Sequence, residues 1–99
     1  MRVDRRYIED AKALLRKMVG VPSVSFSEGP VCDLVFSQLK EWGISPVREG
    51  NNIIAVCPWF NPSNKTLALD AHLDTVPAGS SYSRDPFDAG NEEDTIFGL

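Results

Sequence analysis

The stretch Leu67-Ala-Leu-Asp-Ala-His-Leu-Asp-Thr-Val-Pro77 begins as an apolar run and ends in a His-x-Asp pair shortly before a proline. Consecutive apolar residues at its start are typical of a strand that is buried on both faces, so we expect a strand over Lys65 to Ala71. Side chains two residues apart in a strand point to the same face. The sequence therefore predicts that His72 and Asp74 lie together where a rigid central strand ends.

This His-x-Asp pair has the chemistry of a metal or acid/base site. His72 is the only histidine in the chain, and Asp74 follows it at a distance of two residues. Imidazole is a common metal ligand and proton carrier, and a neighbouring carboxylate can orient it. The alternative is a surface histidine beside a solvated carboxylate. The position of the pair at the end of the expected strand favours a site.

Composition narrows the class of protein. Ten Lys and Arg against 14 Asp and Glu give the 99 residues a net charge of −4, which argues against a nucleic-acid partner. No apolar run approaches the roughly 20 residues that span a bilayer, and Asp4, Glu9 and Lys12 interrupt any signal-peptide core. Two cysteines, Cys32 and Cys57, are too few for a disulfide framework and too widely spaced for a zinc knuckle. These features favour a cytoplasmic protein with reduced thiols and no membrane partner.

Two amphipathic helices are expected in the first half of the chain. The spacing of apolar residues predicts one over Asp4 to Val19, with Asp4 as its N-cap. A second is predicted from Pro30 to Trp42, because proline suits a first turn and Gly43 is suited to the C-terminal cap.

Short β-type runs follow the helices. Ile44 to Arg48 and Asn52 to Cys57 are predicted as strands around the turn Glu49-Gly50-Asn51. We also expect a strand over Thr95 to Leu99 whose continuation is missing, with an ordinary C-terminal edge strand as the alternative. Helices followed by strands indicate an α/β layer fold.

Several segments together resemble a known family. They are Val21-Pro-Ser-Val-Ser25, Gly50-Asn-Asn-Ile-Ile-Ala55, His72-Leu-Asp-Thr-Val-Pro77, Tyr82-Ser-Arg-Asp-Pro-Phe87 and Ile96-Phe-Gly-Leu99. In order and spacing the set is similar to the two-zinc aminoacylase and carboxypeptidase family, which includes acetylornithine deacetylase, succinyl-diaminopimelate desuccinylase and glutamate carboxypeptidases. The resemblance is nearest to the acetylornithine deacetylase-like branch and covers nearly the whole chain.

The resemblance implies that residues 1–99 are the N-terminal segment of a single zinc-exopeptidase-like catalytic domain with a mixed sheet. The rest of that domain and the lid or dimerisation domain would lie elsewhere. It matches His72 to a ligand of one zinc and Asp74 to the active-site carboxylate. It also implies two zinc ions per full-length site, with cobalt as a substitute, and it allows a homodimer.

Some positions depart from the family pattern or fall outside it. Tyr82 stands where the family often has tryptophan. The metal-bridging aspartate, the glutamate general base and the later ligands would follow Leu99. Glu92-Glu93 is not equated with the family's acid pair, because it precedes the position of the bridging aspartate. No substrate-binding residue is assigned.

The expected function is hydrolysis of an N-acyl amino acid by a metal-dependent amidohydrolase of amino-acid metabolism, such as arginine biosynthesis. This chain by itself is expected to be inactive, since it supplies one ligand where a two-metal centre needs several. One alternative is a dipeptidase or aminopeptidase of the same family. The other is a non-catalytic α/β interaction module.

Overall fold

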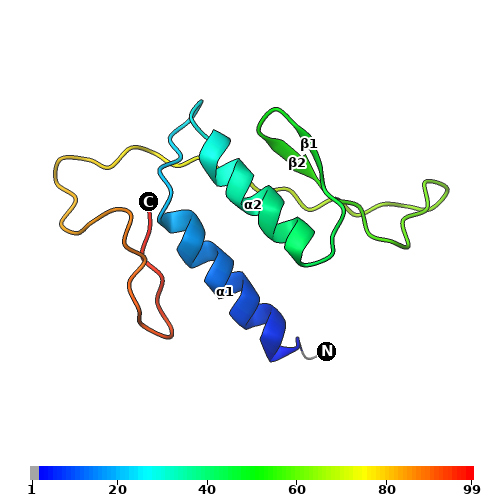
Figure 1. The fold of residues 1–99 in the computed structure, drawn as a ribbon, viewed down its shortest axis with the longest axis horizontal. Coiled ribbons are helices and arrows are strands. Elements are labelled where there is room, and N and C mark those ends of the chain that lie inside the picture. Colours follow the sequence, from blue (N-terminus) through cyan, green and yellow to red (C-terminus); the bar gives the residue numbers. More distant parts are fainter. Residues whose placement is uncertain (1–2) are drawn as a thin grey trace.

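Two helices and a short hairpin form the regular framework of the molecule. The computed structural model describes residues 3–99. Helix α1 spans Arg5–Val19, helix α2 Gly29–Glu41, and strands β1 and β2 span Val47–Glu49 and Asn52–Ile54. Helix α2 packs against α1 and also contacts β2, so it lies between α1 and the hairpin (Figure 1). The predicted α/β arrangement, with two helices followed by strands, is confirmed.

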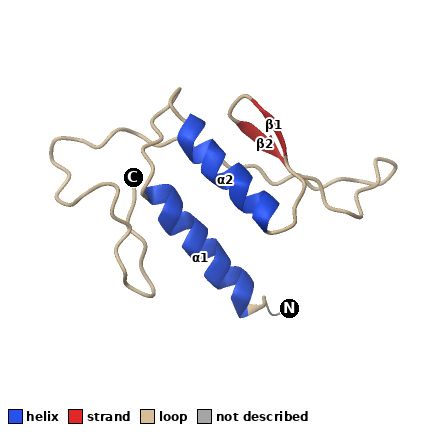
Figure 2. Ribbon diagram, in the orientation of Figure 1, coloured by secondary structure: helices blue, strands red, loops and turns tan. Residues whose placement is uncertain are grey.

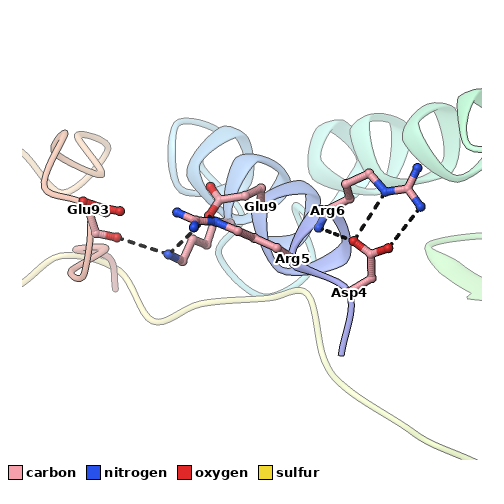
Figure 3. A network of polar contacts seen from close by, with 6 residues as sticks. Asp4, Arg5, Arg6, Glu9 and Glu93 are labelled. Carbon is pink, nitrogen blue, oxygen red and sulfur yellow. Dashed lines mark hydrogen bonds and ion pairs between the residues drawn. The ribbon is translucent and has the colours of Figure 1, made fainter. Parts of the chain in front are cut away.

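Helix α1 begins with the predicted N-cap. The Asp4 carboxylate accepts a hydrogen bond from the backbone N–H of Arg6 at 2.9 Å and pairs with its guanidinium at 3.0 Å, as Figure 3 shows. Such a bond satisfies one of the amides that a helix start leaves unpaired. Further along α1, the Lys12 ammonium donates to the carbonyl of Glu93 at 3.4 Å, which links the helix to the end of the chain.

Helix α2 has the predicted proline and glycine at its two ends. Pro30 lies in the first turn, where its missing N–H costs no helical bond. Gly43 has a φ of 81°, and its N–H donates to the carbonyl of Lys40, while the Ile44 N–H donates to that of Leu39, each at 3.0 Å. This is the paired bonding of a Schellman cap, which favours glycine because an L side chain crowds the backbone at positive φ.

The buried part of the molecule is small and centres on α2. Val31 and Cys32 are fully buried there, and Ala89 and Ser23 are also buried. Cys32 is thus a small core residue of α2, whereas Cys57 is exposed, and both thiols are free. Neither described helix is long and apolar enough to cross a membrane.

The predicted hairpin forms, with shorter strands than expected. Gly50 has a φ of 59° in the turn that the sequence placed at residues 49–51. The antiparallel register pairs Val47 with Ile54, Arg48 with Ile53 and Glu49 with Asn52.

The prediction of a buried strand over residues 65–71 is wrong. This segment has no strand pairing, and Leu67 and Leu69 are 85% and 91% exposed. An apolar run forms a buried strand only when neighbouring strands take up its N–H and C=O groups and other layers cover its faces. The described residues offer neither a paired neighbour nor a cover to this run.

The predicted C-terminal strand and the mixed sheet are also absent from the described part of the chain. Its one sheet is the two-stranded hairpin. Residues 95–99 instead return to the C-terminal end of α1 (Figure 1), where a Cβ at Gly98 would lie 3.1 Å from a methyl group of Val19. The Phe97 N–H donates to the Ala89 carbonyl at 3.1 Å, so this segment pairs with a loop.

Candidate functional site

The predicted His-x-Asp pair lies where a long extended segment meets the loop between the two helices. The Thr75 N–H donates to the carbonyl of Ser23 at 2.8 Å, and Val24 and Thr75 form an isolated parallel bridge. No helix or strand carries the pair itself (Figure 2). The loop before α2 therefore provides the local support that the sequence assigned to a strand.

The structure brings His72 and Asp74 together. The imidazole Nδ1 of His72 lies 2.9 Å from the backbone carbonyl oxygen of Asp74 and 3.1 Å from its carboxylate Oδ1. Both oxygens can only accept when the carboxylate is ionised, so Nδ1 carries the hydrogen in the neutral ring. The other nitrogen, Nε2, then has a free lone pair, which is the form that binds a metal ion. The side chain of His72 is 85% exposed, so this nitrogen is accessible.

Ser25 holds the other side of the Asp74 carboxylate, a contact that the sequence did not predict. Its hydroxyl donates to Asp74 Oδ2 at 2.5 Å. This hydrogen bond, with a smaller contribution from the positive charge that His72 can carry, holds the pKa of Asp74 below its ordinary value of 3.8. Asp74 therefore stays ionised at neutral pH and acts as an acceptor on both oxygens.

An open hollow of about 430 Å³ adjoins the pair. Its apolar lining comes from the C-terminal half of α1, including Leu15, from Val31 of α2, and from the loops and extended segments around them, including Phe87 and Leu99. Its polar lining is confined to the loop before α2 and the segment that carries the pair: Ser23, Ser25, His72, Asp74 and Thr75. An apolar surface therefore lies beside the oriented imidazole of His72 and the ionised carboxylate of Asp74 in this hollow.

The donor set fits part of a metal centre. Among the described residues, no group of three or more His, Cys, Asp or Glu side chains could hold a metal ion. A protein zinc site uses three or four protein ligands. His72 is suited to supply one of them because its ring is oriented by Asp74, which is the arrangement that metal-binding histidines commonly show.

The remaining acidic candidates lie outside this arrangement. Asp70 is exposed on the unpaired segment before the pair. Glu92 and Glu93 contact α1 through their backbone carbonyls, which accept hydrogen bonds from Arg16 and Lys12. Glu92-Glu93 therefore lies alongside the C-terminal half of α1.

Comparison with known proteins finds relatives in Escherichia coli, among them the following two. The chain is 31% identical over 94 residues to the "Uncharacterized protein YgeY" of Escherichia coli K12, and equally to that of Escherichia coli O157:H7. Each match covers 93% of this chain and 23% of the relative, so the chain spans about a quarter of the length of these proteins. No family model and no solved structure matches the chain.

Proposed function

We propose that this chain is the N-terminal portion of a metal-dependent amidohydrolase that deacylates N-acyl amino acids. The observation that carries the proposal is the geometry of His72: two acceptor atoms of Asp74 take the Nδ1 hydrogen and leave Nε2 free. An imidazole held in this tautomer is prepared for a metal ion, because the coordinating lone pair is available without rearrangement of the ring. The resemblance of the surrounding segments to the two-zinc aminoacylase and carboxypeptidase family supports the reaction class.

Each residue of the pair has a distinct role in this proposal. His72 would hold one of two zinc ions, with cobalt as a substitute, through Nε2. Asp74 would fix the ring orientation and raise its basicity through Nδ1–H, while its own charge adds a negative potential beside the metal. When bound, the metal centre polarises the amide carbonyl of the substrate and lowers the pKa of a bound water. The apolar wall of the adjoining hollow suits the hydrocarbon part of an acyl group.

The proposal assigns the missing ligands and the general base to a longer protein that includes this chain. The relatives are about four times as long as the part that the chain matches, which leaves room for these groups. In that protein, the parts that this chain does not cover would supply the strands of a mixed sheet of the zinc-exopeptidase type. A cytoplasmic location, a small-molecule substrate and a homodimer belong to the same proposal.

The decisive experiment measures zinc per chain and initial hydrolysis rate in the full-length protein and three alanine variants. We expect His72→Ala to lose both metal and activity, because it removes a ligand. Asp74→Ala should keep more metal than His72→Ala and still turn over about 10–100-fold more slowly than wild type. Asp70→Ala is the matched control on the same segment, and its correctly folded fraction should keep wild-type metal and rate.

A panel of substrates, together with the metal content, distinguishes the proposed deacylase from a peptidase and from a non-catalytic module. N-acetylated amino acids, with N-acetylornithine among them, are compared with dipeptides at equal enzyme concentration. Faster cleavage of dipeptides would assign a peptidase of the same family. A wild-type protein without bound zinc or cobalt would indicate the non-catalytic module, and equal rate and metal content in His72→Ala and wild type would refute the assignment of the pair.

A further inference from the structure

The loop between α1 and α2 is fastened to the candidate site by three adjacent residues. Ser23 accepts from the Thr75 N–H at 2.8 Å, Val24 bridges to Thr75, and Ser25 donates to the Asp74 carboxylate at 2.5 Å. These contacts join residues about fifty positions apart in the sequence. Ser23 is only 4% exposed, so the base of this junction is shielded from water.

The backbone turns sharply directly after Ser25. Phe26 has a φ of 71°, a conformation that a bulky L residue rarely adopts, and its ring is 99% exposed, so no burial compensates for it. Two hydrogen bonds of 2.9 Å hold the turn: Phe26 N–H to the Glu28 carboxylate, and Ser27 N–H to the Val24 carbonyl. The direction of Ser25 is thereby fixed by the start of α2.

We propose that Ser25 is a positioning residue for the His72–Asp74 pair. A carboxylate on a short side chain rotates freely unless both oxygens are engaged. With Oδ2 bound to the Ser25 hydroxyl, Oδ1 points toward His72 Nδ1, and the ring presents Nε2 outward. Because the His72 ring is largely exposed, packing does little to orient it. Its orientation depends on the backbone carbonyl and the carboxylate of Asp74, and Ser25 acts on the carboxylate.

The effect of Ser25 on metal binding and turnover rests on the proposed function, whereas its effect on the His72 tautomer does not. The geometric claim is that the Ser25 hydroxyl biases the His72 tautomer, and this can be tested in the metal-free chain. It differs from a purely structural role, in which loss of the hydroxyl would weaken the loop and leave the imidazole tautomer unchanged.

The test uses the fact that His72 is the only histidine of the 99 residues. In the 15N-labelled chain, two-bond 1H–15N correlations from one imidazole report directly which nitrogen carries the hydrogen. At pH about 8, where an ordinary histidine is neutral, we expect the Nδ1–H form to dominate in wild type. Ser25→Ala should shift the ratio toward Nε2–H by roughly 2- to 12-fold, the range that corresponds to one net hydrogen bond.

Two variants complete the comparison. Ser25→Thr keeps a hydroxyl and should retain the wild-type ratio, and Ser80→Ala, an exposed serine of a distant loop, is the matched control. If circular dichroism shows that Ser25→Ala has lost helix, Ser25→Cys takes its place, because a thiol is similar in size to a hydroxyl but a much weaker donor, so the ratio should shift in the same direction by a smaller factor. An unchanged tautomer ratio in the folded alanine or cysteine variant overturns the proposal, as does a shift of equal size in Ser80→Ala.

The same variants in the full-length protein give the catalytic consequence. Ser25→Ala is expected to reduce zinc affinity or kcat by about 10-fold or more with a smaller change in KM, and Ser25→Thr to restore them. A full-length protein that binds no zinc would refute the proposed function, whereas the tautomer ratios would still decide the role of Ser25.

Discussion

Replacing Thr75 by proline should detach the segment that carries the candidate site. The Thr75 N–H donates to the Ser23 carbonyl at 2.8 Å, and proline has no hydrogen to donate and places a ring methylene there instead. Ser23 is 4% exposed, so water cannot readily replace the lost donor. The perturbation therefore removes a hydrogen bond and leaves a shielded carbonyl without a partner.

The burial of Ser23 determines how much unfolding free energy the Thr75→Pro variant should lose. A net hydrogen bond contributes about 0.5–1.5 kcal/mol, whereas a buried polar group that loses its partner costs about 1–3 kcal/mol. The second range applies here, so the free energy of unfolding should fall by about 1–3 kcal/mol. Expressed as an equilibrium, the docked state of the segment becomes roughly 5- to 150-fold less favoured.

Urea unfolding followed by far-UV circular dichroism measures the loss of global stability. Limited proteolysis of residues 70–77 measures how far the segment has detached. Thr75→Ala keeps the N–H and should stay within about 0.5 kcal/mol of wild type. Val76→Pro is the control for proline itself, because the Val76 N–H makes no hydrogen bond with the described residues. Equal stability and equal cleavage of Thr75→Pro and Thr75→Ala would refute the reasoning, and so would an equal loss in Val76→Pro.

Two further predictions concern the loop before α2 and the start of α1. Phe26→Gly should stabilise the chain by about 0.5–1 kcal/mol in urea unfolding, because glycine tolerates the φ of 71° and the exposed ring contributes no burial. Phe26→Ala keeps a Cβ, so a gain equal to that of glycine would contradict this explanation. The pKa of Asp4 is lowered by its side-chain and backbone hydrogen bonds with Arg6, so its contribution to stability is present above its usual pKa of 3.8 and is lost as pH falls below that value. Asn also caps helices, so Asp4→Asn should have a lower thermal midpoint than wild type near pH 7, and the difference should shrink as the pH falls below 3.8. A pH-independent difference would refute the electrostatic account.

The sequence alone determined the parts of the fold whose causes are local. Apolar spacing and the cap at Asp4 define α1, and Pro30 and Gly43 define the ends of α2. Gly50 similarly determines the turn between β1 and β2. In each case the hydrogen bonds or dihedral angles concerned involve residues within a few positions of one another, so a short window of sequence contains the necessary information.

The strand predicted over residues 65–71 depended on partners that a local pattern does not supply. A run such as Leu67-Ala-Leu69 is apolar whether or not neighbouring strands are present to pair with it. Strand formation needs long-range hydrogen bonds and cover on both faces, and the described residues provide neither.

In the candidate site too, the contact between neighbouring residues was predictable from the sequence and the contact between distant residues was not. His72 and Asp74 are two residues apart, so the sequence could predict that an imidazole and a carboxylate lie within reach of each other; their roles stay predictions. Ser25 is 49 residues from Asp74, and no periodicity connects them. Only the tertiary structure, by docking Thr75 onto the loop before α2, decided that a serine hydroxyl would hold this carboxylate, because that contact depends on how distant segments pack.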